Sequence, residues 1–305
     1  MKGKNDYIMP KISVLLAVYN EEKYIEEAVQ SVISQTEKDF ELIIVDDGST
    51  DNTLSKLMEI KKNDERIKVL SPGKVGKNGA FNLAFSQSKA KLITLFAGDD
   101  KMPHNSLECR IQPFEERKIF ESNIALYGKL LTMSEDKKYN NLLLPKKKMK
   151  GVRTGGTIVF TRSLAEVIFP IPLNYPNEDT WISLNVDYFA KEIIDIPSVL
   201  LNYRIHSGNS LKRNISFEAS SEKLHSRFLI YDDFLTQHKD YLGKENINNL
   251  SSKIKLENLR FNNKTMKILT VRNVSIKEKI RAIFYSNKYL YALKVSLDHH
   301  ILGRL

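Results

Sequence analysis

The sequence predicts an α/β protein with a mostly parallel central sheet, flanked by helices and followed by a helical C-terminal extension. Three observations predict this fold. Four short apolar runs open the chain, segments with helical spacing separate them, and the pattern is helical from about residue 215 onward. Strands that alternate with helices indicate parallel strands joined by right-handed crossovers. A length of 305 residues is enough for one large domain and part of another.

The first four strands are bounded by polar or turn residues. They are ISVLLAV from Ile12, ELIIV from Glu41, IKVL from Ile67 and KLITLF from Lys91. Helical spacing of apolar residues predicts the helices between them. The first helix has the face Ile25, Ala28, Val29, Val32 and Ile33, and the second has Leu54, Leu57 and Met58.

The middle of the chain is mixed. TGGTIVF from Thr154 is typical of a loop and then a strand, NEDTWISLNVDYFA from Asn177 of a helix, and Ser198–Ile205 of a strand followed by a turn. We therefore expect an α/β domain over residues 1–210 and a basic helical region over residues 211–305.

Composition limits the kind of protein. Hydrophobic residues make up 42% of the chain, which is typical of a folded protein. The single cysteine, Cys109, excludes a disulfide framework and argues against a cysteine-based zinc site. No apolar run approaches the ~18 residues that span a bilayer, and the N-terminus has no apolar signal region. We expect a cytoplasmic protein, with peripheral contact to the inner face of a membrane through the basic C-terminal helices as a further hypothesis.

The net charge of +10 is unevenly distributed. Between Lys264 and Leu305 there are nine Lys or Arg residues against Glu278 and Asp298, and PKKKMK at Pro145–Lys150 forms a second basic cluster. One interpretation is a solvated surface. The other is an anionic partner, such as membrane headgroups or a charged acceptor.

Unusual polar residues follow three of the predicted strands. YNEE follows the first at Tyr19–Glu22, DDGSTD the second at Asp46–Asp51, and GDD the fourth at Gly98–Asp100. Ligands of parallel sheets bind outside the carboxyl ends of the strands. A capped turn explains Gly48–Asp51 but not Asp46 and Asp47, since clustered carboxylates need partners. They could accept hydrogen bonds from a base N–H or from ribose hydroxyls.

The adjacent carboxylates of Asp99 and Asp100 repel each other unless a cation lies between them. Mg²⁺ typically binds one or two carboxylates together with phosphate oxygens. The pair therefore favours a metal–diphosphate site, although a DD pair before a turn is also common as plain structure.

Together, VYNEEKYIEEAVQSVISQT, FELIIVDDGSTD, GDD, NED and YRIHSGNS resemble, in this order, the family 2 glycosyltransferases of the GT-A fold. The resemblance covers about residues 10–210. It implies an inverting, metal-dependent transferase that moves a sugar from a nucleotide-sugar, expected to be a UDP-sugar. The acceptor would be a hydroxyl of a glycan or lipid-linked glycan in cell-surface polysaccharide biosynthesis.

The resemblance also assigns a nucleotide site. It implies nucleotide contacts at Ala17, Tyr19, Glu21, Asp46, Asp47, Gly76, Lys77, Asn82 and Gly98. In GKVGKNGAFN, Gly76 and Asn82 match a Gly-rich family segment, while Phe81 replaces the usual Arg. Lys77 could supply positive charge there, or be a solvated loop lysine.

The cofactor implied is Mn²⁺ or Mg²⁺, with Asp99, Asp100 and His206 as ligands. The family's Asp-any-Asp motif falls on Ala97–Asp99, so Ala97 replaces its first Asp. Imidazole suits Mn²⁺ better than Mg²⁺.

The NED motif resembles the segment that activates the acceptor in the family. It implies Asp179 as the general base and Glu178 as its support, although acidic residues are also common at a helix N-terminus. Gly155, Gly156, Trp181 and Arg204 would face the donor sugar, the acceptor or the phosphates. Trp181 could equally be a core residue.

Two other classes remain open. A nucleotidyltransferase would also combine a nucleotide-binding α/β fold with a metal, but it usually has a Gly-rich, Arg-containing loop where this chain has YNEE. The positive charge would also suit a non-catalytic membrane or nucleic-acid binder. Because the strand ends are acidic, we expect no nucleic-acid partner.

Overall fold

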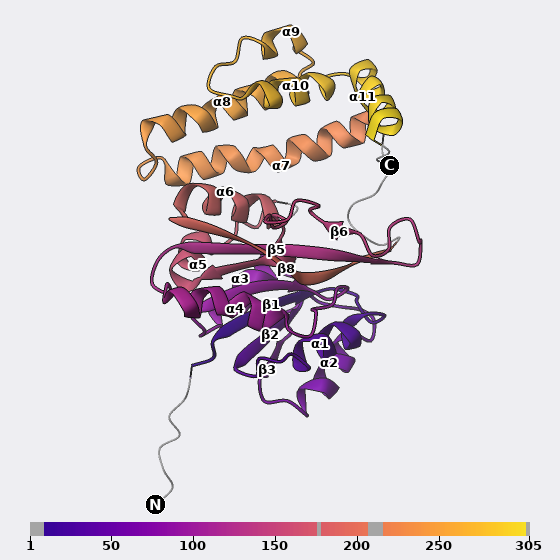
Figure 1. The fold of residues 1–305 in the computed structure, drawn as a ribbon, viewed down its shortest axis with the longest axis vertical. Helices are drawn as coiled ribbons and strands as arrows, with labels where there is room; N and C mark the ends of the chain where they lie inside the picture. The colour runs from indigo at the N-terminus through magenta and orange to yellow at the C-terminus, as the bar shows by residue number, and fades with distance from the viewer. Residues whose placement is uncertain (1–8, 176–177, 207–215, 303–305) are drawn as a thin grey trace, which may run out of the picture. The chain divides into compact units, whose positions relative to one another are not determined.

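The computed structural model describes residues 9–175, 178–206 and 216–302, with side chains as far as residue 296. The chain divides into two compact units, residues 1–209 and 210–305 (Figure 1).

The first unit is built on an eight-stranded sheet. The strands are β1 (Ile12–Val18), β2 (Phe40–Asp46), β3 (Ile67–Leu70), β4 (Leu92–Ala97), β5 (Ile124–Ser134), β6 (Leu143–Leu144), β7 (Ile158–Thr161) and β8 (Glu192–Ile205). Their order is β3-β2-β1-β4-β7-β5-β6, and β8 pairs with β5. The first four strands are mutually parallel, as their alternation with helices predicts. The predicted strand Ser198–Ile205 is the second half of the longer β8.

Strand β7 runs against its neighbours. It pairs antiparallel with β4 and with β5, whereas β5 and β8 are parallel to each other. The start of β7, preceded by the short 3₁₀ helix η1 (Gly155–Thr157), therefore lies at the same edge as the end of β4.

Helices cover this sheet. They are α1 (Ile25–Ile33), α2 (Thr53–Lys61), α3 (Lys77–Ser86), α4 (Ser106–Arg117), α5 (Arg162–Ile168) and α6 (Asp179–Phe189). Apolar residues of α1, α2 and α4 form one core with alternate residues of β1, β2 and β4. The predicted apolar face of α1 is buried, but Met58 of α2 is 46% exposed, so its assignment to a buried face is wrong.

Arg110 of α4 is fully buried beneath the junction of β4, β7 and β8. Its guanidinium donates to Thr94 Oγ1 at 2.8 Å and to the carbonyls of Ile158, Gly156 and Leu200 at 3.0, 2.7 and 3.1 Å. Burial lowers the pKa of Arg110 to about 9. These bonds connect strands of opposite direction and fix the backbone of η1.

The second unit is helical. It contains α7 (Phe217–His238), α8 (Lys244–Phe261), α9 (Thr265–Ile268), α10 (Ile276–Phe284) and α11 (Lys288–Leu302). Helices α7 and α8 lie side by side (Figure 1), and Leu256, Ile268, Val271 and Ala282 form a small core between α8, α9 and α10. Within the described part of the chain, no helix is both long and apolar enough to cross a membrane.

Candidate functional site

Three polar turns meet at one edge of the sheet. In the register of the parallel strands, Val18 lies opposite Asp46, and Ala17 lies opposite Ala97. The turns after β1, β2 and β4 therefore begin at the same level, as the strand pattern predicts. The N-terminus of β7 adds η1 to the same edge.

The turns after β1 and β2 are tied together through their backbones. Ser49 Oγ accepts from the N–H of Asn20 at 2.9 Å, and Asn20 Oδ1 accepts from the N–H of Thr50 at 2.8 Å. The N–H of Glu21 donates to Thr53 Oγ1 at 2.8 Å. Asn20 has a φ of 54°, in the left-handed region that Asn adopts more readily than most residues. The two turns therefore form one preorganised rim.

Asp46 is 1% exposed at the end of β2. Its Oδ2 accepts from the N–H of Ser49 at 3.2 Å and from Ser71 Oγ at 3.3 Å. Its Oδ1 has no hydrogen-bond partner among the described residues. A buried acceptor without a partner is costly, so this oxygen is suited to accept a hydrogen bond from a bound ligand.

Asp47 is committed to its own loop. Its Oδ1 accepts from the N–H groups of Val75 and Gly76 at 2.6 and 2.7 Å, and its Oδ2 pairs with Lys74 at 3.0 Å. The Lys74 ammonium also lies 3.1 Å from the centre of the half-exposed Tyr19 ring. Asp47 therefore positions the segment that leads into α3, and its predicted nucleotide contact stays a prediction.

Glu21 packs beside the turn that follows β4. A Cβ at Gly98 would come within 3.1 Å of Glu21 Cγ and 2.9 Å of Val18 Cγ1, so this position requires glycine. Burial, followed by the nearby charges of Asp99 and Asp51, raises the pKa of Glu21 to about 7. In the structure, Gly98 lets the two turns approach each other, and its predicted nucleotide contact stays a prediction.

The two carboxylates after β4 have different surroundings. Asp99 is partly exposed, and its Oδ2 lies 3.2 Å from His206 Nε2. Asp100 is 4% exposed, and its Oδ1 accepts from the backbone N–H of Arg204 at 2.8 Å. Burial and the neighbouring Asp99 raise the pKa of Asp100 well above its ordinary value. Of the predicted metal ligands, Asp99 and His206 lie together, while Asp100 holds the end of β8.

Arg204 supports this turn from β8. Its Nε donates to the carbonyl of Asp99 at 2.7 Å, its guanidinium pairs with Glu27 of α1, and it stacks 4.6 Å from the ring of Tyr24. These contacts differ from the predicted sugar contact. Arg204 fixes the position of Asp99, and neither Glu27 nor Tyr24 was singled out in the sequence.

Lys77, at the first position of α3, forms an ion pair with Glu178 at 2.8 Å between Nζ and Oε1. Burial disfavours the lysine charge, but Glu178 and then the carboxylates of Asp179 and Asp99 outweigh this effect and raise the pKa of Lys77. Glu178 is 5% exposed, and its Oε2 has no hydrogen-bond partner in the described ranges. Lys77 therefore lies within the field of carboxylates from both sides of the site.

Asp179 begins α6, and its Oδ1 accepts from the N–H of Gly155 in η1 at 2.9 Å. A Cβ at Gly155 would lie 3.3 Å from Asp179 Oδ1 and 3.4 Å from Glu178 Oε1. A side chain there would press on both carboxylates, which explains the glycine. Asn177, the first residue of the NED motif, and Ser207–Ser210 lie outside the described residues.

Three predicted contact residues have structural partners instead. Trp181 is 2% exposed and donates from Nε1 to the Ile168 carbonyl at 2.6 Å, so its assignment to a sugar is wrong. A Cβ at Gly156 would come within 2.6 Å of Leu201 Cδ2, so Gly156 is required for packing. The amide of Asn82 donates to the carbonyl of Ile171 at 2.8 Å and accepts from the N–H of Ile171 at 2.7 Å.

The described residues contain no group of three or more His, Cys, Asp or Glu side chains that could hold a metal ion unaided. Asp99 and His206 offer one oxygen and one nitrogen donor, which suits an ion that takes its remaining ligands from a diphosphate and water. These two donors therefore suit a metal ion that binds together with a diphosphate better than one held by the protein alone.

Comparison with known proteins gives the site a context. A sequence model described as "Glycosyl transferase family 2" matches residues 13–165. An uncharacterized glycosyltransferase of Nostoc sp. is 26% identical over 215 residues, covering 66% of both chains. A Campylobacter jejuni protein named GalNAc(5)-diNAcBac-PP-undecaprenol beta-1,3-glucosyltransferase is 34% identical over 110 residues, 35% of this chain and 36% of that protein. The match spans only part of the length of other relatives, such as 20% of an uncharacterized glycosyltransferase from Rickettsia bellii.

Solved structures share the fold. Residues 1–349 of S. aureus TarS, in complex with UDP-GlcNAc, superpose with a TM-score of 0.58 at 19% identity, covering 93% of this chain and 83% of that one. The mannosyltransferase PcManGT of Pyrobaculum calidifontis, in complex with GDP-Man and Mn²⁺, has a TM-score of 0.58 at 14% identity, covering 97% and 82%. At these identities the likeness concerns the fold alone.

Proposed function

Because the chain belongs to glycosyl transferase family 2 and has the GT-A fold, we propose that it is an inverting glycosyltransferase that uses a nucleotide-sugar donor. The observation that carries this proposal is a convergence at one sheet edge. The buried acceptor oxygen of Asp46, the partly exposed Asp99 and the backbone-held Asp179 all lie there, on three different elements.

The donor that we propose is a UDP-sugar. Asp46 Oδ1 is a buried acceptor without a described partner, and it would accept a hydrogen bond from the base or the ribose. Tyr19 beside Lys74 offers an exposed ring on the same rim. TarS, which shares the fold, is described with UDP-GlcNAc, whereas PcManGT is described with GDP-Man, so both nucleotides belong in the test.

The metal that we propose is Mn²⁺, with Mg²⁺ as the alternative, held by Asp99 and His206. When bound, it would neutralise charge on the diphosphate leaving group. Ala97, at the position of the missing carboxylate, leaves the site with fewer protein ligands. We therefore expect metal affinity to be weak without nucleotide and stronger with it.

The residues around Asp179 suggest how transfer proceeds. Asp179, oriented by the N–H of Gly155, would accept the proton of the acceptor hydroxyl as its oxygen attacks the anomeric carbon. The bond between that carbon and the diphosphate breaks in the same displacement, which inverts the configuration. Lys77 is paired with Glu178, and the charge of Asp99 also acts on it. In this position its ammonium would stabilise the departing diphosphate.

The acceptor that we propose is a hydroxyl of a glycan or lipid-linked glycan in cell-surface polysaccharide synthesis. The support is the name of the C. jejuni relative, which includes PP-undecaprenol, and that match covers 35% of this chain. We also propose that the chain works in the cytoplasm, at the inner face of the membrane.

Calorimetric titration of UDP and GDP, with and without Mn²⁺, tests the proposal. We expect UDP to bind more tightly with Mn²⁺, and Asp99→Ala to remove that Mn²⁺ dependence, while the exposed control Asp136→Ala retains it. Failure of both nucleotides to bind under every condition would overturn the proposal. Binding of GDP alone would change the donor and leave the enzyme class intact.

A further inference from the structure

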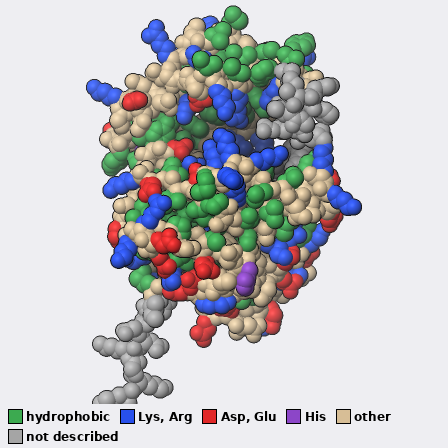
Figure 2. Space-filling view, viewed as in Figure 1, with side chains coloured by type: hydrophobic (Ala, Val, Ile, Leu, Met, Phe, Trp, Pro, Cys, Tyr) green, Lys and Arg blue, Asp and Glu red, His purple; other side chains and the backbone are tan. Residues whose placement is uncertain are grey.

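Helices α9–α11 expose an unusual number of large apolar side chains. Seven lie within thirty residues: Met266, Leu269, Ile276, Ile280, Tyr289, Leu293 and Val295. Met266 and Ile276 are 77% and 76% exposed, values more typical of charged residues. Figure 2 shows apolar side chains gathered along the part of this unit where α9, α10 and α11 lie, with Lys and Arg side chains beside them.

The two exposed isoleucines form a stripe on α10. Ile276 and Ile280 are four residues apart, so they lie on one face of the helix. Exposed Lys277 and Arg281 flank that stripe, and Ala282 on the opposite face belongs to the small core. Helix α10 thus has one face buried in the unit and another, apolar and basic, that no described residue covers.

Helix α9 continues this surface. Lys279 of α10 donates to the carbonyl of Leu269 at 3.0 Å, which holds the two helices together. Exposed Met266 and Leu269 lie on either side of Lys267 in the chain. The apolar residues of α9 and α10 therefore belong to adjoining helices.

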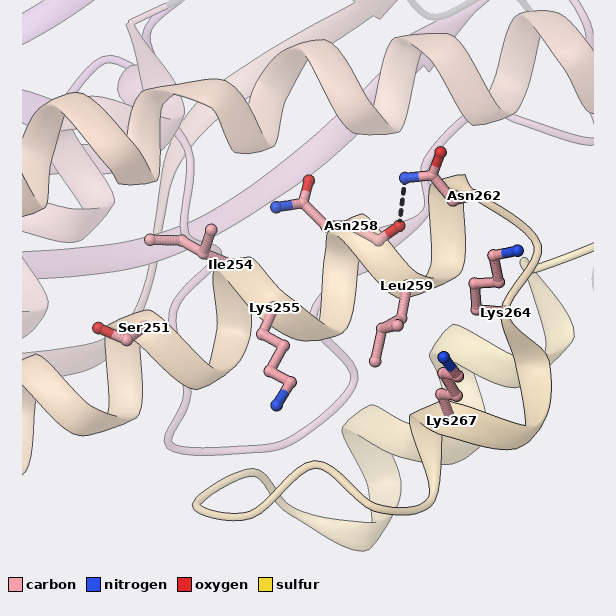
Figure 3. A pocket seen from close by; sticks show the side chains of 8 residues that line it. All are labelled: Ser251, Ile254, Lys255, Asn258, Leu259, Asn262, Lys264 and Lys267. Atoms are coloured by element: carbon pink, nitrogen blue, oxygen red, sulfur yellow. Dashed lines mark hydrogen bonds between the residues drawn. The ribbon is translucent and has the colours of Figure 1, made fainter.

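A hollow of about 470 Å³ lies between α8 and α9 (Figure 3). Its lining residues are Ser251, Ile254, Lys255, Asn258, Leu259, Asn262, Lys264 and Lys267. In Figure 3, Lys255 of α8 and Lys267 of α9 enter it from two sides, with Leu259 between them, and Lys264 lies at its rim. None of these three lysines forms an ion pair within the described ranges, while the nearby acidic Glu257 and Glu278 are paired with Arg260 and Lys253.

We propose that the surface formed by Met266, Leu269, Ile276 and Ile280, together with the lysine-lined hollow, binds an anionic phospholipid bilayer. The apolar side chains would enter the interface, and Lys255, Lys264 and Lys267 would bind lipid phosphates. Exposed apolar residues flanked by basic ones are the recognised features of helices that lie in a membrane surface. The unpaired lysines favour an anionic partner over a second copy of this basic chain. The inference deepens the membrane location in the proposed function but rests on these side chains alone.

Vesicle co-sedimentation of the full chain tests this proposal. We expect binding to vesicles of phosphatidylcholine mixed with phosphatidylglycerol, but not to phosphatidylcholine alone. Both Ile276→Ser/Ile280→Ser and Lys264→Glu/Lys267→Glu should weaken binding about tenfold or more. The matched controls are Met9→Ser/Met58→Ser and Lys137→Glu/Lys138→Glu, which change exposed residues of the first unit outside the basic cluster at Pro145–Lys150. These controls should bind as the parent does.

Three outcomes would overturn the surface. The first is that the chain does not bind anionic vesicles, and the second is that the control pairs weaken binding as much as the test pairs do. The third is that Ile276→Ser/Ile280→Ser leaves vesicle binding unchanged but dissociates an oligomer of the chain. UDP titration of the same variants separates this inference from the proposed function. Retained UDP binding without vesicle binding would reject the surface only, and vesicle binding without nucleotide binding would reject the transferase only.

Discussion

The carboxylate of Asp179 is oriented by the N–H of Gly155 and lies beside the Lys77–Glu178 ion pair. If it is the general base, Asp179→Asn should reduce sugar transfer by about 10²–10⁴-fold, since an amide cannot accept the proton. UDP affinity should stay within about twofold, because the amide oxygen can still accept from Gly155. Transfer with the identified donor and calorimetry on the same preparation would measure both quantities.

The two measurements on Asp179→Asn distinguish a general base from a residue that only maintains the structure of the site. Loss of transfer together with loss of UDP binding would mean that Asp179 holds the site together. Full activity in Asp179→Asn would exclude it as the base. Glu178→Gln offers a comparison, because we expect it to weaken Lys77 positioning while leaving some transfer.

The ionised carboxylate of Glu21 lowers the free energy of unfolding, and this effect depends on pH. Its pKa is raised to about 7 from 4.5, so folding favours the protonated form. The ionised carboxylate therefore destabilises the fold above pH 7, and the cost disappears as the pH falls from 7 towards 4.5. Glu21→Gln should raise the free energy of unfolding by about 1 kcal/mol at pH 8, after allowance for partial exposure.

Urea unfolding in EDTA at pH 8 and pH 5 would test this effect. We expect the advantage of Glu21→Gln to be largest at pH 8 and to shrink at pH 5. The exposed Glu65→Gln is the control, and it should show no such difference. An advantage that is equal at both pH values would show that the substitution acts through packing rather than through charge.

At the scale of the element, the start of α3 depends on a residue from another strand. Asp47 accepts from the N–H groups of Val75 and Gly76, just before the helix. Asp47→Ala leaves both groups without this acceptor and should lower the free energy of unfolding by about 2 kcal/mol. UDP affinity should fall as well, because Lys77 begins the same helix. Urea unfolding and calorimetry would show whether both fall, compared with the exposed Asp240→Ala.

The parallel half of the sheet could be predicted because each strand is a contiguous apolar run between turn residues. Ile12–Val18 and Leu92–Ala97 are examples, and both are almost fully buried. The antiparallel placement of β7 between β4 and β5 could not be predicted, since its four residues carry no signal of direction. Strand β5 was not identified, because its neighbours in space, β7 and β8, lie far along the chain.

The candidate site, like the sheet, could be predicted from the sequence only in part. Local motifs predicted the turns that carry Asp46 and Asp99 and the helix that begins at Asp179, because each motif is complete within a few residues. The surroundings of Trp181 and Arg204 depend on distant partners, Ile168 and Glu27 among them, which no local motif contains. Arg110 did leave a signal, since it is the one charge on the apolar face of Leu107, Ile111 and Phe114.

At the scale of the whole molecule, the two units have separate cores. In the second, Arg260 is 2% exposed and pairs with Glu257 at 2.6 Å. Arg260→Met would leave Glu257 buried without its cation, which should cost about 3–5 kcal/mol. All of the proposed nucleotide contacts lie in residues 1–209, so UDP affinity should not change. Calorimetric unfolding and UDP titration, with exposed Arg272→Met as control, would test this independence, and a parallel loss of UDP binding would contradict it.

The bond between Asp100 and Arg204 has a consequence for the order of folding. The pairings among β1, β2 and β4 join residues within the first hundred, whereas the turn after β4 is secured by a residue 104 positions further along the chain. Contacts of long sequence separation form late, because closing the loop costs entropy first. During synthesis, the pairings among β1, β2 and β4 can form while the chain is still emerging. The turn that carries Asp99 would reach its final shape only after β8 has been made.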